Sequence, residues 1–121
     1  MKRTKVDIPF KEIKYIHHIS DVHIRNLKRH AEYEQVFEKL YDKIKENREN
    51  SLIYIGGDIA HSKTDMSPEL VDQTSRFLKS LSEICPTIVI TGNHDCNLNN
   101  LNRLDVLTPI INNLDLPNLH Y

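Results

Sequence analysis

Three short apolar runs alternate with two amphipathic helical segments, and this order constrains the fold more than any other feature of the sequence. The apolar runs cover residues 13–20, 52–55 and 87–91. They are rich in Ile, Val and Tyr, which is the composition expected of strands buried on both faces. Strand, helix, strand, helix, strand predicts an α/β fold in which two successive right-handed βαβ units form a parallel sheet flanked by helices.

The two segments between the strands each carry an apolar stripe at helical spacing. The predicted buried stripes are Tyr33, Val36, Phe37, Leu40 and Ile44 in the first segment, and Leu70, Val71, Thr74, Phe77, Leu78 and Leu81 in the second. Ser67 can cap the second helix, with Pro68 at its first position. A third, shorter helix is expected at about residues 101–114, followed by the start of a strand at residues 119–121.

Length and composition limit the classes of protein to which the chain can belong. The 121 residues suffice for one domain with a hydrophobic core, and the formal net charge of -1 gives no global sign of a nucleic-acid or membrane partner. Cys85 and Cys96 are the only cysteines, and no apolar stretch is long enough for a signal peptide or a membrane span. These features predict a reducing, cytoplasmic setting.

Polar motifs follow each predicted strand. They are Asp21-Val22-His23, Gly56-Gly57-Asp58 and Gly92-Asn93-His94-Asp95, and they contain all three glycines of the chain. Because loops at the carboxyl ends of parallel strands meet in one crevice, the motifs are predicted to converge in space. Glycine allows the backbone to approach a metal or phosphate closely. Taken singly, Asp21 or Asp58 could cap a helix or turn, and His23 or His94 could simply be hydrogen-bonded.

The combined side chains form a mixed oxygen and nitrogen donor set. Two carboxylates, an imidazole and an amide suit manganese, iron or zinc. If Asp58 bridges two ions about 3.5 to 4 Å apart, the ions would clamp a phosphoryl group and activate a bound water. Hydrolysis of a phosphate ester follows from this arrangement.

The order DVH, GGD, GNHD resembles the calcineurin-like metallophosphoesterase superfamily over nearly the whole chain. The resemblance implies that Asp21 and His23 hold the first metal, that Asp58 bridges, and that Asn93 reaches the second metal. It makes His94 the catalytic group that stabilises the transition state or protonates the leaving oxygen.

The same resemblance gives Asp95 a supporting role, orienting nearby imidazoles. It also implies an αββα sandwich, of which residues 1–121 would be an incomplete N-terminal part.

The stretch GGDIAHSK resembles the branch of DNA-repair nucleases that includes bacterial SbcD. His61, three residues after Asp58, would help to position the DNA backbone or the leaving group, although it could also be an ordinary surface histidine. Ala60 departs from the hydrophobic residue usual in the branch. The resemblance implies manganese as the metal, DNA as the substrate and an SMC-like ABC ATPase as the partner of the full-length protein.

A basic segment follows the first motif. Arg25, Lys28 and Arg29 are candidate contacts for the phosphate backbone of DNA. Glu32 and Glu34 follow closely, so a solvated loop and helix start explains these charges equally well.

The chain lacks the three later histidines with which the superfamily completes its site. It also has strands for only one of the two sheets, so one apolar sheet face is predicted to be exposed. A fragment, a natural truncation, or completion by a partner or by a second copy in a homodimer would each explain this. Three hypotheses follow: a DNA nuclease activity of the full-length protein, a phosphatase or cyclic-nucleotide phosphodiesterase activity, and a non-catalytic module.

Overall fold

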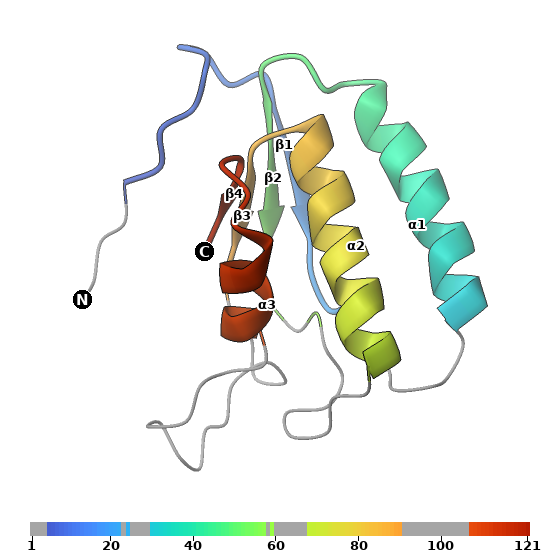
Figure 1. Ribbon diagram of the computed structural model, residues 1–121. Helices are drawn as coiled ribbons and strands as arrows, with labels where there is room; N and C mark the ends of the chain where they lie inside the picture. Colours follow the sequence, from blue (N-terminus) through green and yellow to red (C-terminus); the bar gives the residue numbers. More distant parts are fainter. Residues whose placement is uncertain (1–4, 23, 25–29, 58, 60–67, 91–106) are drawn as a thin grey trace.

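The fold is a parallel sheet with helices on one side (Figure 1). The computed structural model describes residues 5–22, 24, 30–57, 59, 68–90 and 107–121. Its elements in chain order are β1 (Tyr15–Ile19), α1 (His30–Lys45), β2 (Ser51–Ile55), α2 (Pro68–Ile84), β3 (Thr87–Val89), α3 (Leu107–Leu114) and β4 (Leu119–His120). The predicted alternation of strands and helices is confirmed.

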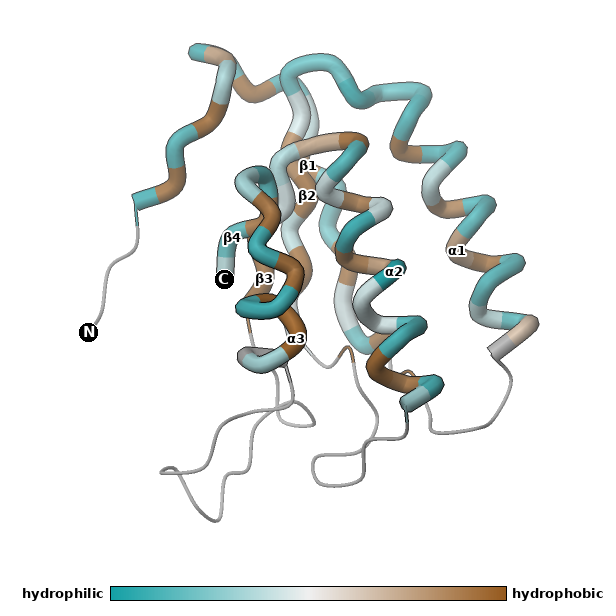
Figure 2. Tube along the Cα trace, viewed as in Figure 1, coloured by the Kyte–Doolittle hydropathy of each residue, from teal (hydrophilic) through white to brown (hydrophobic). Residues whose placement is uncertain are grey.

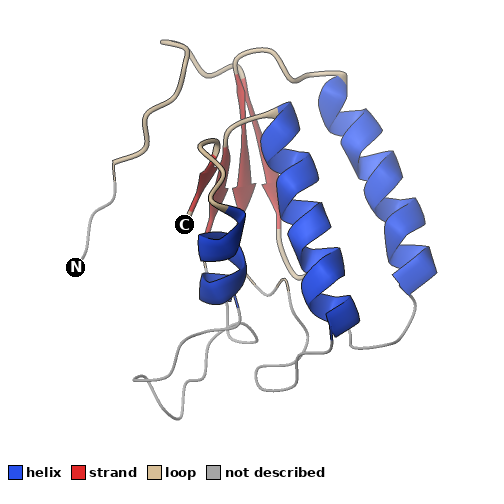
Figure 3. Cartoon of the chain, viewed as in Figure 1, coloured by secondary structure: helices blue, strands red, loops and turns tan. Residues whose placement is uncertain are grey.

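The strands of the described residues lie in the order β1-β2-β3-β4 and all pair in parallel. Sequential strand order with a helix in each connection places successive helices on the same face when the crossovers share one hand. Figure 3 shows α1, α2 and α3 together in front of the sheet. The carboxyl ends of the strands therefore share one edge, as the motif positions require.

The hydrophobic core lies between this sheet face and the helices. Ile53 and Ile55 of β2 and Val89 of β3 have 0% to 1% of their surface exposed. The same core cluster contains Phe77 of α2, which is fully buried and lies against Phe37 in a tilted arrangement with a ring-centroid distance of 4.3 Å. Figure 2 shows the apolar residues of α2 recurring at helical spacing, as the sequence predicts.

Two predictions about burial are wrong. The first apolar run was expected to be buried on both faces, but β1 is an edge strand, and Tyr15 and Ile16 are 50% and 62% exposed. Val36, placed in the buried stripe of α1, is 60% exposed. β1 has no neighbouring strand on its outer side among the described residues, and Val36 lies on an exposed face of α1, so apolar composition alone did not determine burial at either place.

The sheet face opposite the helices is open. Because side chains alternate along a strand, Ile16 and His18 of β1 and Tyr54 of β2 point away from the helices. Ile90, directly after β3, lies on the same face and is 45% exposed. The exposed apolar sheet face predicted from the sequence is thus present in the described residues.

The helix boundaries agree with the sequence signals where they can be compared. α2 begins at Pro68, as predicted, while its expected cap Ser67 lies outside the described residues. α3 covers the second half of the segment predicted to be helical, and residues 101–106 lie outside the described residues. In the described part of the chain, no helix combines the length and apolar character needed to cross a membrane.

Tyr41 of α1 gives the fold a testable pH dependence. Burial raises the pKa of its phenol, and Glu38 and Glu34 add to the rise, while a hydrogen bond with Ser80 and the charge of Arg76 oppose it. The unfolded phenol ionises near pH 10, so the unfolded state loses this proton first. Folding stability from this group is complete below about pH 10 and falls as pH rises toward the folded pKa.

We therefore expect Tyr41→Phe to lessen the alkaline loss of stability. Urea unfolding followed by circular dichroism from pH 8 to pH 11 measures the loss of stability in both proteins. All other titrating groups are the same in the two, so any difference is due to Tyr41. Parallel curves for the two proteins above pH 10 would contradict the assignment.

Candidate metal centre

The first two motifs are joined to each other by their backbones. The hydrogen bonds run from Gly56 N to Ile19 O at 2.8 Å, from Asp21 N to Gly57 O at 3.3 Å, and from Ile24 N to Ile59 O at 2.6 Å. They extend the contact between β1 and β2 past the last paired residues, Ile19 and Ile55. The segments that carry the two motifs therefore run side by side beyond the sheet.

Ile24 and Ile59 anchor these segments. Each is fully buried and belongs to the main hydrophobic core. Each also directly follows a predicted metal ligand, His23 and Asp58 respectively. Sequence analysis did not identify these anchors, although an apolar residue next to each ligand was a usable signal.

Asp21 is the predicted metal ligand that the structure describes. Its φ angle is 55°, in the left-handed region that Asp tolerates better than most residues. The residue is exposed, and Ser20 Oγ donates a hydrogen bond to Asp21 Oδ2 at 3.2 Å. Backbone strain of this kind concentrates at functional positions. An accessible carboxylate on a constrained backbone is a suitable oxygen donor for a divalent cation.

Glycine is favoured at positions 56 and 57 for two different structural reasons. Gly57 has a φ angle of 101°, which side-chain-bearing residues rarely adopt, and its carbonyl accepts the hydrogen bond from Asp21. Gly56 lies against His18, whose Nε2 would be 3.0 Å from an added Cβ. Gly57 thus takes part in the close contact between the two motif segments, while the approach of these glycines to a metal or phosphate stays a prediction.

We expect Gly57→Ala to lower the free energy of unfolding by about 1 to 3 kcal/mol, because alanine is strained at this φ angle. Gly56→Ala is the matched control, with a smaller expected loss, since the imidazole of exposed His18 can move away. Urea denaturation of both variants measures the difference. A larger loss of unfolding free energy for Gly56→Ala would show that packing, and not the backbone angle, is the main reason for glycine at these two positions.

The third motif follows β3. Ile90 N donates to Ile55 O at 3.0 Å, so the chain leaves β3 alongside the carboxyl end of β2. The remaining predicted site residues, His23, Arg25, Lys28, Arg29, Asp58, His61, Asn93, His94 and Asp95, lie outside the described residues. Among the residues that are described, no group of three or more His, Cys, Asp or Glu side chains is arranged to hold a metal.

Known proteins match nearly the whole length of this chain. The family model for calcineurin-like phosphoesterases matches residues 14–119. An uncharacterized protein of Acanthamoeba polyphaga mimivirus is 56% identical over 113 residues, which cover 91% of this chain and 8% of that protein. The chain therefore spans a small part of the length of this relative.

Proposed function

Because the chain belongs to the calcineurin-like phosphoesterase family, we propose that it supplies the first three motifs of a nuclease site that hydrolyses phosphodiester bonds in DNA. The family as a whole binds divalent metals and hydrolyses phosphate esters. The backbone contact between Asp21 and Gly57 carries the proposal, because it brings the DVH and GGD segments together at the carboxyl edge of the sheet.

The proposal gives each candidate metal ligand a specific role. Asp21 and His23 would hold one divalent cation, Asn93 the other, and Asp58 would contact both. The cations, with manganese as the favoured metal, supply Lewis acidity toward the phosphoryl group. The donor types fit such cations, and the carboxylate-bearing Asp21 is exposed and thus accessible to one of them.

The other candidate residues act on the substrate. His94 would donate a proton to the leaving oxygen, and Asp95 would help to orient the imidazoles around it. His61 would position the phosphodiester backbone near the scissile bond. Arg25, Lys28 and Arg29 would neutralise phosphates next to this bond. The sequence GGDIAHSK supports DNA over other esters, because it resembles the SbcD-type branch.

The decisive experiment uses the full-length protein with manganese. We expect cleavage of single-stranded and hairpin DNA, and loss of cleavage in His94→Ala. Turnover of small phosphate esters with inert DNA would select a phosphatase or cyclic-nucleotide phosphodiesterase instead. An SMC-like ABC ATPase that co-purifies with the full-length protein would support the repair assignment.

The exposed sheet face opposite the helices, where Ile16 and Ile90 are 62% and 45% exposed, supports a second candidate, a non-catalytic module that binds partners through this face. Calorimetric titration with manganese separates the two. Tight binding of two ions by the full-length protein supports the nuclease, while no binding supports the module.

A further inference from the structure

The open face of the sheet carries a small cluster of side chains beside the GGD motif. His18 of β1 lies opposite Tyr54 of β2 in the strand register, and their ring centroids are 5.2 Å apart in a tilted arrangement. His18 is exposed, and Tyr54 is partly buried. Neither residue is among the proposed metal ligands or substrate contacts, so this pair of rings needs a separate explanation.

The cluster is packed against Gly56. A Cβ atom added at this position would lie 3.0 Å from His18 Nε2, 3.5 Å from Ser20 Cβ and 3.6 Å from Tyr54 Cε1. The first distance is shorter than ordinary van der Waals contact, so the imidazole occupies space that a side chain at position 56 would need. Residues 18 and 20, and residues 54 and 56, are each two positions apart along their segments, so they share the open face.

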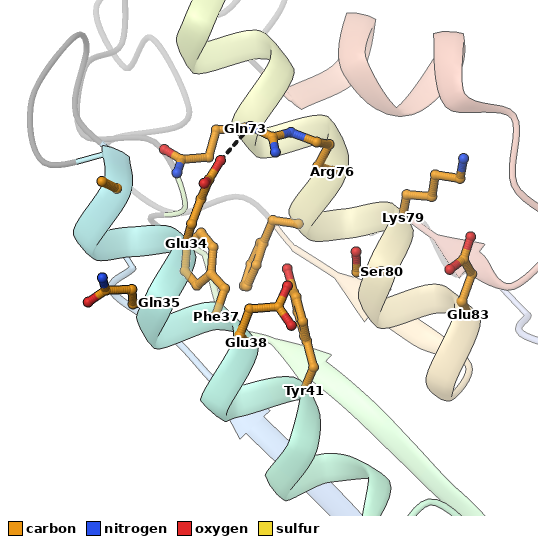
Figure 4. A pocket seen from close by; sticks show the side chains of 12 residues that line it. Glu34, Gln35, Phe37, Glu38, Tyr41, Gln73, Arg76, Lys79, Ser80 and Glu83 are labelled. Atoms are coloured by element: carbon orange, nitrogen blue, oxygen red, sulfur yellow. Dashed lines mark ion pairs between the residues drawn. The ribbon is translucent and has the colours of Figure 1, made fainter.

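The helix side of the sheet is covered in a different way. There α1 and α2 pack over the core, and Arg76 of α2 joins Glu34 of α1 at 2.7 Å, as the dashed line in Figure 4 shows. The helices of the described residues all lie on this side of the sheet (Figure 3). None of them therefore holds Gly56 from the open face, where the nearest side-chain atom beyond its chain neighbours is His18 Nε2.

Gly56 is the point at which the two motif segments join. Its N–H donates to Ile19 O at 2.8 Å, and the next residue, Gly57, accepts a hydrogen bond from Asp21 N at 3.3 Å. A shift of the Gly56 backbone toward the open face would disturb both hydrogen bonds. Since the proposed ligand Asp58 directly follows Gly57 in the sequence, such a shift would also displace it relative to Asp21.

Ser20 extends the cluster to the first proposed metal ligand. Its Cβ is the second of the three contacts at Gly56, and its Oγ donates a hydrogen bond to Asp21 Oδ2 at 3.2 Å. Loss of a side chain that holds metal ligands in place typically costs about 10- to 100-fold in metal affinity or activity. The cluster around Gly56 contacts both segments of the candidate site and can therefore have this effect.

We propose that His18 is a positioning residue of the metal centre. Its imidazole, supported by the Tyr54 ring, packs on Gly56 and keeps the GGD segment in place beside Asp21. This inference rests on the function proposed above. His18 contacts neither the metal nor DNA in this role, so it acts on cleavage only through the placement of the ligands. Glycine is required at position 56 because a side chain there would displace the ring.

The test uses the full-length protein and calorimetric titration with manganese. His18→Ala removes the ring, and we expect the manganese affinity to fall about tenfold or more. At a subsaturating manganese concentration, the kcat for cleavage of single-stranded DNA should fall as well, while KM should change little because His18 does not contact DNA. His18→Gln keeps a nitrogen near the position of Nε2 and should recover part of the affinity.

Ile16→Ala is the matched control. Ile16 lies on the same strand and the same face, is 62% exposed, and is not among the three nearest contacts of Gly56. Its substitution should leave the manganese affinity nearly unchanged. Thermal unfolding shows whether either variant acts through stability, and we expect small and similar shifts for both, because both side chains are exposed.

A double-mutant cycle tests the contact itself. Gly56→Ala alone should lower the manganese affinity, because the added methyl group displaces the imidazole. In the His18→Ala background the same methyl group has room, so Gly56→Ala should cause little further loss. Independent losses that simply add would mean that the ring does not act through Gly56.

Three other results would also overturn the inference: unchanged affinity in His18→Ala, equal losses for His18→Ala and Ile16→Ala, or a loss of affinity that merely follows a loss of folding. The proposed function would survive each of them, provided that the unsubstituted full-length protein binds manganese and cleaves DNA. If the unsubstituted protein bound no manganese, the proposed function and the role of His18 would fail together.

Discussion

Asp21→Asn is expected to lower phosphodiester cleavage by the full-length protein more than about a hundredfold. Loss of a residue that merely supports a metal ligand costs about 10- to 100-fold, and Asp21 is proposed to be a ligand itself. The substitution removes one negative charge and leaves an amide that is a weaker donor to manganese. Cleavage of single-stranded DNA and calorimetric titration with manganese should fall together.

The fold should tolerate this change. Asn, like Asp, adopts the left-handed backbone conformation recorded at φ 55°, and its side-chain oxygen can still accept the hydrogen bond from Ser20. We expect the free energy of unfolding to stay within about 0.5 kcal/mol of the original value. Loss of cleavage without loss of stability would separate a metal ligand from a structural residue.

Asp115→Asn provides the matched control. Asp115 also has a positive φ angle, 45°, and is exposed, but it lies between α3 and β4, at the amino ends of the strands. The same chemical change in the same backbone conformation should therefore leave metal binding and cleavage unaltered. If Asp21→Asn retained full cleavage, the ligand role of Asp21 would be refuted, while a general nuclease function could survive through the other motifs.

The order of elements was predictable because each signal for it is local. Apolar runs, helical spacing and Pro68 at a helix start depend on near neighbours in the sequence, and the structure has the corresponding strands and helices. Burial is different, since it depends on which faces other elements cover. Tyr15 and Ile16 lie on the edge strand β1 and Val36 lies on the outer face of α1, and all three are half exposed or more although the sequence placed them in buried segments.

The candidate site also has features that local sequence patterns predict and features that they do not. Strand-end placement of the motifs follows from local patterns, and it agrees with the described edge of the sheet at Asp21 and Gly57. The backbone bonds between the two motif segments join residues more than 30 positions apart, so no local pattern could reveal them. The metal and catalytic roles of the remaining site residues stay predictions.

Phe77→Ala is expected to have the largest effect on stability. Phe77 is fully buried, makes a tilted ring contact with Phe37 and lies near Tyr41, so it connects α2 to α1 across the core. Removing a buried phenyl ring costs about 3 to 5 kcal/mol, through lost transfer energy and the remaining cavity. Since domains of this size are stable by only about 5 to 15 kcal/mol, much of the folding free energy would be lost.

Urea denaturation followed by circular dichroism measures this loss, and Phe10→Ala is the control. Phe10 is only partly buried and lies outside the main core cluster, so its removal should cost far less than the removal of Phe77. Phe77→Leu leaves a smaller cavity than alanine and should recover part of the stability. Similar losses for Phe77→Ala and Phe10→Ala would mean that α1 and α2 do not depend on the aromatic contact between them.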